Sequence, residues 1–384
     1  MRFLFVVPPL TGHINPTVSV ARALEARGHE VAWVGHPGKV RPLLPAGARL
    51  FALPEDATAD HAARVQDKAA TTRGAAALKF LWEDFLVPLA RSMRPGIAAA
   101  VAELAPDVMC CDQQAIAGGL VARMRGVPWA TLATTSAGIS DPLGALPQVK
   151  QWFEALIGGL EREAGLPHAG ELSPHLVIAF TTSALVPGEL PAHYKLVGPA
   201  IADRPEPTPF PFEQLDRPCV LVSMGTVNAE TSARFYAVTV EALGDQPYQV
   251  VLAAPPELVP RRPPNFIVQR YVPQLALLSR VDAVVCHGGH NTTCEALAHG
   301  VPLVIAPIKD DQPIVAEQVV AAGAGMRIKF GRVQAAELRA AVAQVLADPA
   351  LRAGAARVRA SFIAAGGATT AAAHLEHLGA HHER

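Results

Sequence analysis

The chain has 384 residues and a net charge of −1, with no block of Lys and Arg that would indicate binding to nucleic acid. Half of the residues are hydrophobic but only 5% are aromatic, so the apolar mass comes from Ala, Val and Leu. This composition suits an α/β protein with Ala-rich helices, and the length favours two domains.

Nothing in the sequence indicates export or insertion into a membrane. The N-terminal segment MRFLFVVPPL is apolar but short, and we interpret it as a buried strand rather than a signal peptide. No run of about 18 apolar residues predicts a transmembrane helix. The five cysteines form neither a C-x-x-C pair nor a spaced framework, which indicates a reducing, cytoplasmic compartment.

Strands alternate with helices in the first half of the chain, which predicts a parallel, doubly wound sheet. We expect strands over 3–7, 30–35, 107–111 and 129–132, and helices over 16–27, 78–91, 96–104 and 115–125. The proline-dense segment 199–218 predicts a linker to a second cycle. In that cycle we expect strands over 220–223, 248–253, 267–270, 283–286 and 302–306, and helices over 229–242, 273–278, 334–346, 349–362 and 368–378. Two Rossmann-like domains should bind ligands at the carboxyl ends of their strands.

A histidine and an aspartate follow two buried strands of the first half. His13 lies in the loop after the first strand, just before a helix whose first turn holds Pro16. The helix N-terminus disfavours a charged imidazole, so His13 could serve as a neutral base, or it could simply pack or cap the helix. Asp112 could orient that base, although taken alone an N-cap role is the better interpretation. Because both should lie at one edge of the sheet, we predict a His–Asp dyad.

A glycine turn in the second half has the character of a phosphate site. A buried strand over 283–286 runs into HGGHNTT and then into a helix, the geometry that directs backbone N–H groups at a phosphate. Gly288 and Gly289 permit close backbone approach. Asn291 and Thr292 are residue types that cap helices and contact anions.

Polar residues near this turn have both functional and structural interpretations. Glu295 is placed to accept both hydroxyls of a ribose, or merely to compensate the helix dipole. His287 and His290 have no third ligand at zinc spacing, so no metal site is expected. The end of the expected strand over 220–223 could also bind phosphate, through Ser223, Gly225 and Thr226. Many loops between a strand and a helix have similar residues, so this pattern is not specific.

Four aromatic residues could contact ligands or belong to the core. Tyr271 could stack on a nucleobase, and a core ring is an equally good interpretation. Phe80, Trp82 and Phe85 offer an aromatic surface to an apolar acceptor, although amphipathic helix packing is the better interpretation.

Three stretches resemble the family 1 glycosyltransferases, nucleotide-sugar-dependent enzymes of bacterial natural-product pathways and of plant secondary metabolism. The stretches are PPLTGHINPTVSVARALEARGHEV, PDVMCCDQQAIAGGLVA, and YVPQ followed by HGGHNTTCEALAHGVPLVIAPIKDDQ. The resemblance implies an α/β fold of the GT-B type, in which two Rossmann-like domains face an interdomain cleft. It implies an acceptor-binding domain over 1–200, a linker over 201–217, a nucleotide-sugar-binding domain over 218–365, and a final helix and tail over 366–384 that packs back on the first domain.

The same resemblance implies roles for individual residues. His13 is the catalytic base and Asp112 orients it. Gly12, in the same loop as His13, is an implied contact to the nucleotide sugar. The implied donor contacts are Ser223, Gly225 and Thr226 near the diphosphate, Tyr271 on the nucleobase, and Val272 and Gln274 beside base and ribose. They continue with His287, Gly289, Asn291 and Thr292 at the phosphates, Glu295 at the ribose, and Asp311 and Gln312 at the transferred sugar. His290 belongs to the same stretch but stands where plant members have tryptophan, so its part of the sugar pocket differs.

The resemblance implies an inverting transfer of a hexose to a hydroxyl of a small, largely apolar natural product. No metal or cofactor is expected, because backbone N–H groups and a helix N-terminus would stabilise the leaving diphosphate. A uridine diphosphate sugar is favoured over a thymidine diphosphate sugar, since Glu295 could hold a 2′-hydroxyl that thymidine nucleotides lack. A homodimer, a non-catalytic sugar-nucleotide binding protein and a sugar-nucleotide epimerase of the same fold remain open. A dinucleotide-dependent oxidoreductase is disfavoured, because the first strand is not followed by G-x-G-x-x-G.

Overall fold

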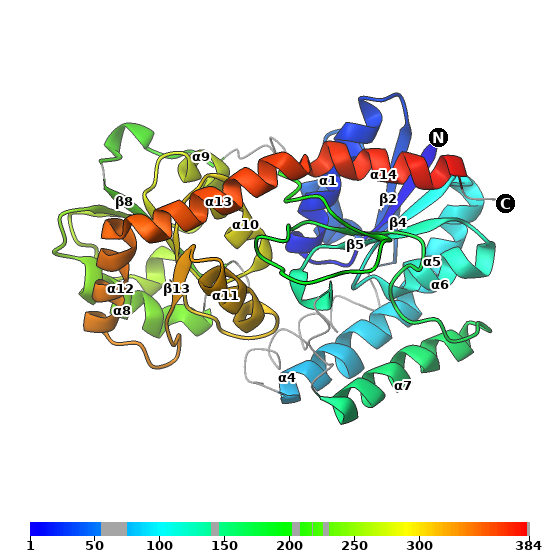
Figure 1. Cartoon of the computed structure of the whole chain (residues 1–384), viewed down its shortest axis with the longest axis horizontal. Helices are drawn as coiled ribbons and strands as arrows, with labels where there is room; N and C mark the ends of the chain where they lie inside the picture. The colour runs from blue at the N-terminus through cyan, green and yellow to red at the C-terminus, as the bar shows by residue number, and fades with distance from the viewer. Residues whose placement is uncertain (55–74, 140–145, 202–207, 217, 226–229, 382–384) are drawn as a thin grey trace. The chain divides into compact units, whose positions relative to one another are not determined.

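The computed structural model describes residues 1–54, 75–139, 146–201, 208–216, 218–225 and 230–381 (Figure 1). The chain divides into two compact units, of which the first comprises 1–181, 188–202 and 365–384. The second comprises 182–187 and 203–364. Each unit is built on one parallel sheet, so the predicted α/β class with two doubly wound sheets is confirmed.

The first unit has seven parallel strands in the order β3-β2-β1-β4-β5-β6-β7. Their bounds are β1 (Arg2–Val6), β2 (Glu30–Gly35), β3 (Arg49–Ala52), β4 (Val108–Asp112), β5 (Trp129–Ala133), β6 (Val177–Ala179) and β7 (Tyr194–Leu196). Strand β1 pairs with β2 on one side and with β4 on the other, so the strand order reverses between β1 and β4. Open α/β sheets bind ligands beyond the strand ends at such a reversal.

Helices cover both faces of this sheet. The helices are α1 (Thr11–Glu25), α2 (Pro37–Val40), α4 (Ala75–Lys79), the π-helix η2 (Phe80–Leu86), α5 (Val87–Leu104), α6 (Ile116–Arg125), α7 (Pro147–Glu163) and α14 (Gly367–His381). Leu4 and Val6 of β1 join one core cluster with residues of α5 and α6. Phe3 and Phe5 join a second cluster with residues of α1 and α14, which run side by side (Figure 1). The strand is therefore apolar at every buried position because both of its faces are covered.

The first helix begins earlier than the sequence predicts. The Leu10 carbonyl accepts the N–H groups of His13 at 3.0 Å and Ile14 at 3.2 Å, so a helical turn forms ahead of Pro16. Pro16 consequently lies inside α1 rather than in its first turn. His13 belongs to the first turn of the helix instead of preceding it.

Tertiary packing also joins two predicted helices. The sequence suggests a break before Gly96, yet α5 continues from Val87 to Leu104. A Cβ at Gly96 would lie 2.3 Å from Cδ2 of Leu53, so the glycine allows α5 to pack closely against that side chain. The preceding turns wind as the π-helix η2, which the 3.6-residue period does not anticipate. Helix α7 and the short strands β6 and β7 also escaped prediction.

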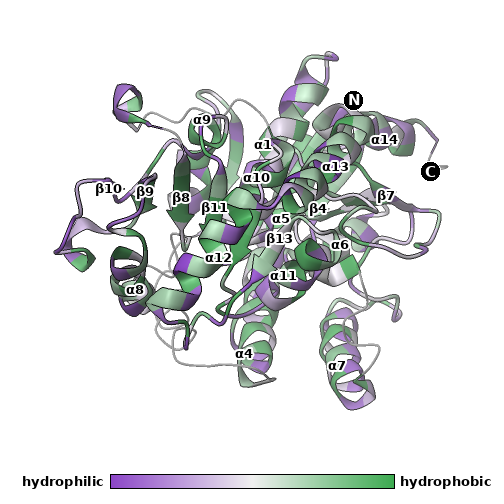
Figure 2. Cartoon of the chain, turned by 60° about the vertical axis from the view of Figure 1, so that its left-hand side comes forward, coloured by the Kyte–Doolittle hydropathy of each residue, from purple (hydrophilic) through white to green (hydrophobic). Residues whose placement is uncertain are grey.

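The second unit has six parallel strands in the order β10-β9-β8-β11-β12-β13. The strands are β8 (Cys219–Ser223), β9 (Gln249–Ala253), β10 (Phe266–Gln269), β11 (Ala283–Cys286), β12 (Leu303–Ile305) and β13 (Gly325–Arg327). The helices are α8 (Ala233–Leu243), α9 (Gln274–Leu278), α10 (His290–Ala298), α11 (Gln312–Ala321), α12 (Ala335–Ala347) and α13 (Pro349–Ala365). Residues of β8, β9, α8 and α12 share a core cluster, and Figure 2 shows α12 with both hydrophobic and hydrophilic faces. The strand order reverses between β8 and β11.

The chain returns from the second unit to the first between α13 and α14. Gly366 and Gly367 adopt positive φ angles of 83° and 57°, which favour glycine. The Gly367 N–H donates to the Val197 carbonyl at 2.7 Å, so the start of α14 is tied to the first unit. Among the described residues, no helix combines the length and the apolar character needed to cross a membrane.

Candidate active site

His13 and Asp112 meet where the strand order of the first sheet reverses. His13 follows β1, in the same exposed turn as Gly12, and Asp112 is the last residue of β4. Nδ1 of His13 is 2.9 Å from Oδ1 and 3.0 Å from Oδ2 of Asp112. The His13 side chain is 15% exposed, whereas that of Asp112 is fully buried. The two residues paired in the sequence analysis are in contact.

The contact decides which nitrogen of His13 can act as a base. A carboxylate only accepts hydrogen bonds, so the proton of the neutral ring resides on Nδ1. Nε2 then holds the lone pair and can take a proton from a substrate. A carboxylate in this position also stabilises the imidazolium that forms when Nε2 is protonated.

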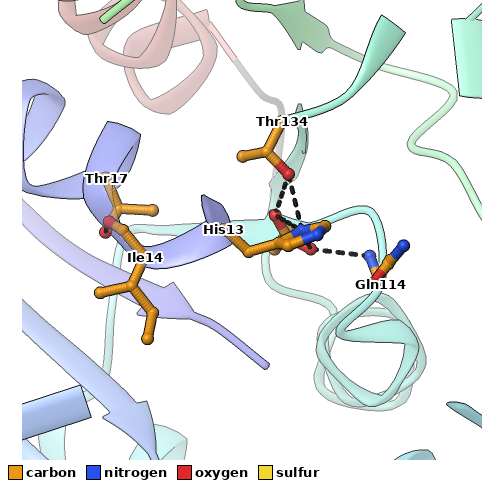
Figure 3. A network of polar contacts seen from close by, with 6 residues as sticks. His13, Ile14, Thr17, Gln114 and Thr134 are labelled. Atoms are coloured by element: carbon orange, nitrogen blue, oxygen red, sulfur yellow. Dashed lines mark hydrogen bonds and ion pairs between the residues drawn. The ribbon is translucent and has the colours of Figure 1, made fainter. Parts of the chain in front are cut away.

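Asp112 is held by two further donors (Figure 3). The backbone N–H of Gln114 donates to Oδ1 at 2.8 Å, and the hydroxyl of Thr134 donates to Oδ2 at 2.6 Å. Oγ1 of Thr134 also lies 2.7 Å from Nδ1 of His13. Thr134 was not predicted from the sequence. Its signal was a hydroxyl directly after β5, the strand that pairs with β4.

The turn between β11 and α10 presents a helix N-terminus. Helix α10 begins at His290 with Gly289 as its N-cap, and the Thr293 N–H donates to the Gly289 carbonyl at 3.0 Å. Asn291 and Thr292 therefore belong to the first turn of the helix and are not its caps, because Gly289 has the extended backbone of the cap position. The positive end of the helix dipole lies at the glycine turn, a position suited to an anion.

The imidazole of His287 is wedged between two glycines. A Cβ at Gly225 would lie 2.9 Å from its Cε1, and a Cβ at Gly289 would lie 2.5 Å from its Nε2. Only glycine leaves room for the ring at both positions, and Gly225 also has a φ of 76°. Burial lowers the pKa of His287, and the smaller effect of the Asp311 charge raises it. The net shift is downward, so the ring is neutral at pH 7. A neutral imidazole can donate one hydrogen bond to a phosphate oxygen.

Other predicted donor residues surround this turn. Ser223 ends β8 and is paired in register with Cys286, directly before His287. Thr226 lies outside the described residues. His290 is 6% exposed, and its Nε2 lies 3.6 Å from Sγ of Cys294, one helical turn away.

Gln274 and Glu295, both predicted beside the ribose, contact each other. Nε2 of Gln274, the first residue of α9, donates to Oε2 of Glu295 in α10 at 2.5 Å. Glu295 is only 4% exposed. The amide therefore orients a buried carboxylate, which a helix-dipole role alone would not require.

Asp311 and Gln312 lie at the start of α11, with Asp311 as its N-cap. Oε1 of Gln312 accepts the N–H groups of Ile308 at 2.8 Å and Lys309 at 3.2 Å. The carbonyl end of the Gln312 amide thus closes the loop after β12. Its Nε2 is the end that can donate to another group.

Tyr271 is 59% exposed, so it is not a core ring. Together with the end of β10 and with Thr208, Pro209 and Pro256, it lines an open hollow of about 550 Å³. Val272 follows it and is half-buried. Among the described residues, no three His, Cys, Asp or Glu side chains form a group suited to a metal ion.

The chain is similar over nearly its whole length to several named proteins. It is 31% identical to 4′-demethylrebeccamycin synthase of Lentzea aerocolonigenes, over 94% of this chain and 96% of that protein. It is a family 1 glycosyltransferase. This glycosyltransferase is also 31% identical to the demethyllactenocin mycarosyltransferase of Streptomyces fradiae, over 97% of this chain and 86% of that protein. Residues 237–378 match the family model of the erythromycin biosynthesis protein CIII-like C-terminal domain.

A solved structure agrees with the fold of this glycosyltransferase. The crystal structure of the glycotransferase of kitacinnamycin superposes with a TM-score of 0.81, at 26% sequence identity and over 98% of each chain. The fold is therefore GT-B, as the resemblance implied.

The aromatic residues predicted to meet an acceptor all lie in the π-helix η2 of this glycosyltransferase. Phe80 and Phe85 are 6% and 8% exposed, and Phe85 belongs to a core cluster. Trp82 packs edge-on against Phe153 of α7, with ring centroids 4.5 Å apart. The packing interpretation, which the sequence favoured, describes these contacts.

Proposed function

We propose that this glycosyltransferase transfers a hexose from a nucleoside diphosphate sugar to a hydroxyl of a small, largely apolar natural product, with inversion at the anomeric carbon. The observation that carries the proposal is the contact of His13 Nδ1 with Asp112, which leaves Nε2 as the base. A non-catalytic binding protein would have no need of this pair. The relatives named above, a rebeccamycin-type synthase and a mycarosyltransferase, support a natural-product acceptor.

The reaction moves one proton and exchanges one bond. Nε2 of His13 takes the proton from the acceptor hydroxyl as that oxygen forms a bond to the anomeric carbon. The bond from the anomeric carbon to the diphosphate breaks, and its electron pair leaves with the diphosphate. Attack from the face opposite the leaving group inverts the configuration. General-base assistance of this kind contributes roughly 10² to 10⁴ in rate.

The second unit supplies the groups proposed for the donor. The N-terminus of α10 and the neutral His287 support a diphosphate site, because both can donate hydrogen bonds to its oxygens. The buried carboxylate of Glu295, oriented by Gln274, supports a ribose contact. It favours uridine over thymidine nucleotides, since it could accept from the 2′-hydroxyl. Asp311 could accept hydroxyls of the sugar, and Nε2 of Gln312 could donate to one.

The test of the catalytic proposal is a pair of substitutions in the first unit. His13→Ala should lower kcat by roughly 10² to 10⁴ while the affinity for the nucleotide stays unchanged. Asp112→Asn should also lower kcat steeply, because an amide no longer selects the tautomer with the proton on Nδ1. Asp107→Asn is a matched control, since Asp107 binds the Arg2 N–H at 2.7 Å next to the opposite end of β4. A fully active His13→Ala protein would overturn the proposed role of the base.

The donor is tested by thermal shift against UDP, dTDP, GDP and NAD⁺. A ligand at about 100 times its Kd adds roughly 2.7 kcal/mol of stability. Stabilisation by UDP, with a smaller effect of dTDP, is the expected result. A larger effect of dTDP would overturn the preference for uridine, and stabilisation by NAD⁺ alone would overturn the donor site.

A further inference from the structure

We propose that Thr134 is a positioning residue for the His13–Asp112 pair, acting through its side-chain hydroxyl. The inference rests on the proposed role of His13 as the general base. It adds a third member to the pair, contributed by a third neighbouring strand end.

Three adjacent parallel strands bring these groups together. His13 follows β1, Asp112 ends β4 and Thr134 follows β5, and β4 pairs with both of the other strands. Oγ1 of Thr134 is 2.6 Å from Oδ2 of Asp112 and 2.7 Å from Nδ1 of His13. Thr134 is 3% exposed and Asp112 is 2% exposed, so neither contact competes freely with bulk water.

The hydroxyl completes the set of donors around the carboxylate. Oδ1 of Asp112 accepts the backbone N–H of Gln114 as well as the imidazole N–H. Oδ2 shares the same imidazole N–H, and its second donor is the Thr134 hydroxyl. Without that hydroxyl, the two oxygens become unequal, and the carboxylate can turn towards Gln114. The imidazole, which follows the carboxylate, would then lose its defined orientation.

The same contact helps to hold charge in the right place during the reaction. When Nε2 accepts the proton of the acceptor, the ring becomes an imidazolium and its Nδ1–H stays on the ring. The Thr134 hydroxyl, which donates to Oδ2, holds the carboxylate beside Nδ1 while this charge develops. The imidazolium therefore faces a full negative charge.

A purely structural role for the hydroxyl is disfavoured by the backbone of the same loop. The Thr134 N–H donates to the Leu132 carbonyl at 3.2 Å, and the Gln113 N–H donates to the same carbonyl at 3.1 Å. These contacts hold the end of β5 against the end of β4 without the side chain.

The experiment compares Thr134→Val, which removes the hydroxyl at nearly constant volume, with Thr134→Ser, which keeps it. Thr131→Val is the matched control, because Thr131 lies on β5, the strand that Thr134 follows. Thr131 is 1% exposed, and its Oγ1 accepts the Ser173 N–H at 2.8 Å. Rates are measured with UDP-glucose and two phenol acceptors, 4-methoxyphenol and 4-nitrophenol. The hydroxyl of 4-nitrophenol loses its proton far more readily than that of 4-methoxyphenol, so its transfer rate depends less on a general base.

We expect Thr134→Val to lower kcat for 4-methoxyphenol by about 10- to 100-fold, with an unchanged KM for the donor. The loss should shrink for 4-nitrophenol, and Thr134→Ser should recover most of the rate. Thr131→Val should lower the melting temperature but not kcat. Equal losses with both phenols, an inactive Thr134→Ser protein, or an unchanged kcat in Thr134→Val would each overturn the inference, and Thr134→Ser decides it where Thr134→Val fails to fold.

A double substitution separates this inference from the proposed function. In a His13→Ala background, Thr134→Val should cost no further activity, because the hydroxyl acts through the ring. If His13→Ala is inactive and Thr134→Val fully active, only the role of Thr134 fails. If His13→Ala itself retains full activity, the proposed base fails, whatever Thr134 does.

Discussion

Gly289→Ala should displace the His287 ring and weaken nucleotide binding without unfolding the protein. Gly289 is the N-cap of α10 and has φ −60°, so alanine adds no backbone strain. The new Cβ would lie 2.5 Å from Nε2 and 2.9 Å from Cε1 of His287. The perturbation is therefore steric and confined to one ring.

The magnitude follows from these distances. Ordinary contact between heavy atoms begins near 3.5 Å, so the ring must retreat by about 1 Å. It has little room to do so, because Gly225 is also packed against it, with its Cβ position 2.9 Å from Cε1. A displacement of about 1 Å can cost roughly 100-fold in function. We expect nucleotide affinity to fall by about 10- to 100-fold.

The stability cost should be much smaller than the loss of affinity. Replacing an N-cap glycine by alanine costs about 1 kcal/mol, which corresponds to roughly 2–4 °C in a unit of this size. Calorimetric titration of UDP measures affinity, and a thermal scan measures stability. Gly331→Ala is the matched control, because no atom lies within 4 Å of its Cβ position.

A double substitution tests whether the effect passes through the ring. In a His287→Ala background, Gly289→Ala should cost little further affinity, since the ring that it crowds is gone. The reasoning is refuted if Gly289→Ala binds UDP as tightly as the wild-type protein does. It is also refuted if the two substitutions weaken binding independently.

The remaining predictions concern a buried ion pair in the first unit and the packing at two glycines. Glu161, 1% exposed and bound by Arg123 at 2.6 Å, has a pKa below 4.5: burial raises it, but hydrogen bonds, chiefly from Arg123, outweigh burial. Glu161→Gln should lower the free energy of unfolding by about 3 kcal/mol near pH 7. Because the pKa of Glu161 is depressed in the folded state, this stability difference between wild type and variant should shrink as the pH falls below 4.5. Thermal scans from pH 7 to pH 3 that show a constant difference would contradict the assignment. Gly354→Ala would place a Cβ 1.9 Å from the Gly323 carbonyl oxygen and should cost at least about 3 kcal/mol by denaturant titration. Gly159→Ala, whose Cβ would meet nothing closer than 4.0 Å, should instead stabilise α7 by about 0.5–1 kcal/mol, and equal outcomes for the two glycines would argue against the packing account.

Local sequence signals determined the α/β class and the glycine turn between β11 and α10. A buried strand, two glycines and the start of a helix occur within a few residues, and each has a short-range physical cause. The prediction of HGGHNTT as a strand–turn–helix junction depended only on neighbouring residues. The cap itself was misplaced, because Asn291 and Thr292 have cap propensity but Gly289 has the required backbone.

The pairing of His13 with Asp112 was predictable for a different reason. Parallel strands bring their carboxyl ends to one edge, so two residues 99 positions apart could be expected to meet. Thr134 obeys the same rule, but its place depends on β5 lying next to β4. A hydroxyl after a strand is too common to single out from the sequence.

Only the tertiary structure decided which partners the polar side chains bind and which segments stay helical. Contacts between segments distant in the chain turn Gln274 towards Glu295, and a tightly closed loop engages the carbonyl end of Gln312. Close packing against Leu53 accompanies the continuation of α5 past its expected break. Propensity and periodicity describe a residue and its near neighbours, whereas these outcomes depend on groups that folding brings together from elsewhere in the chain.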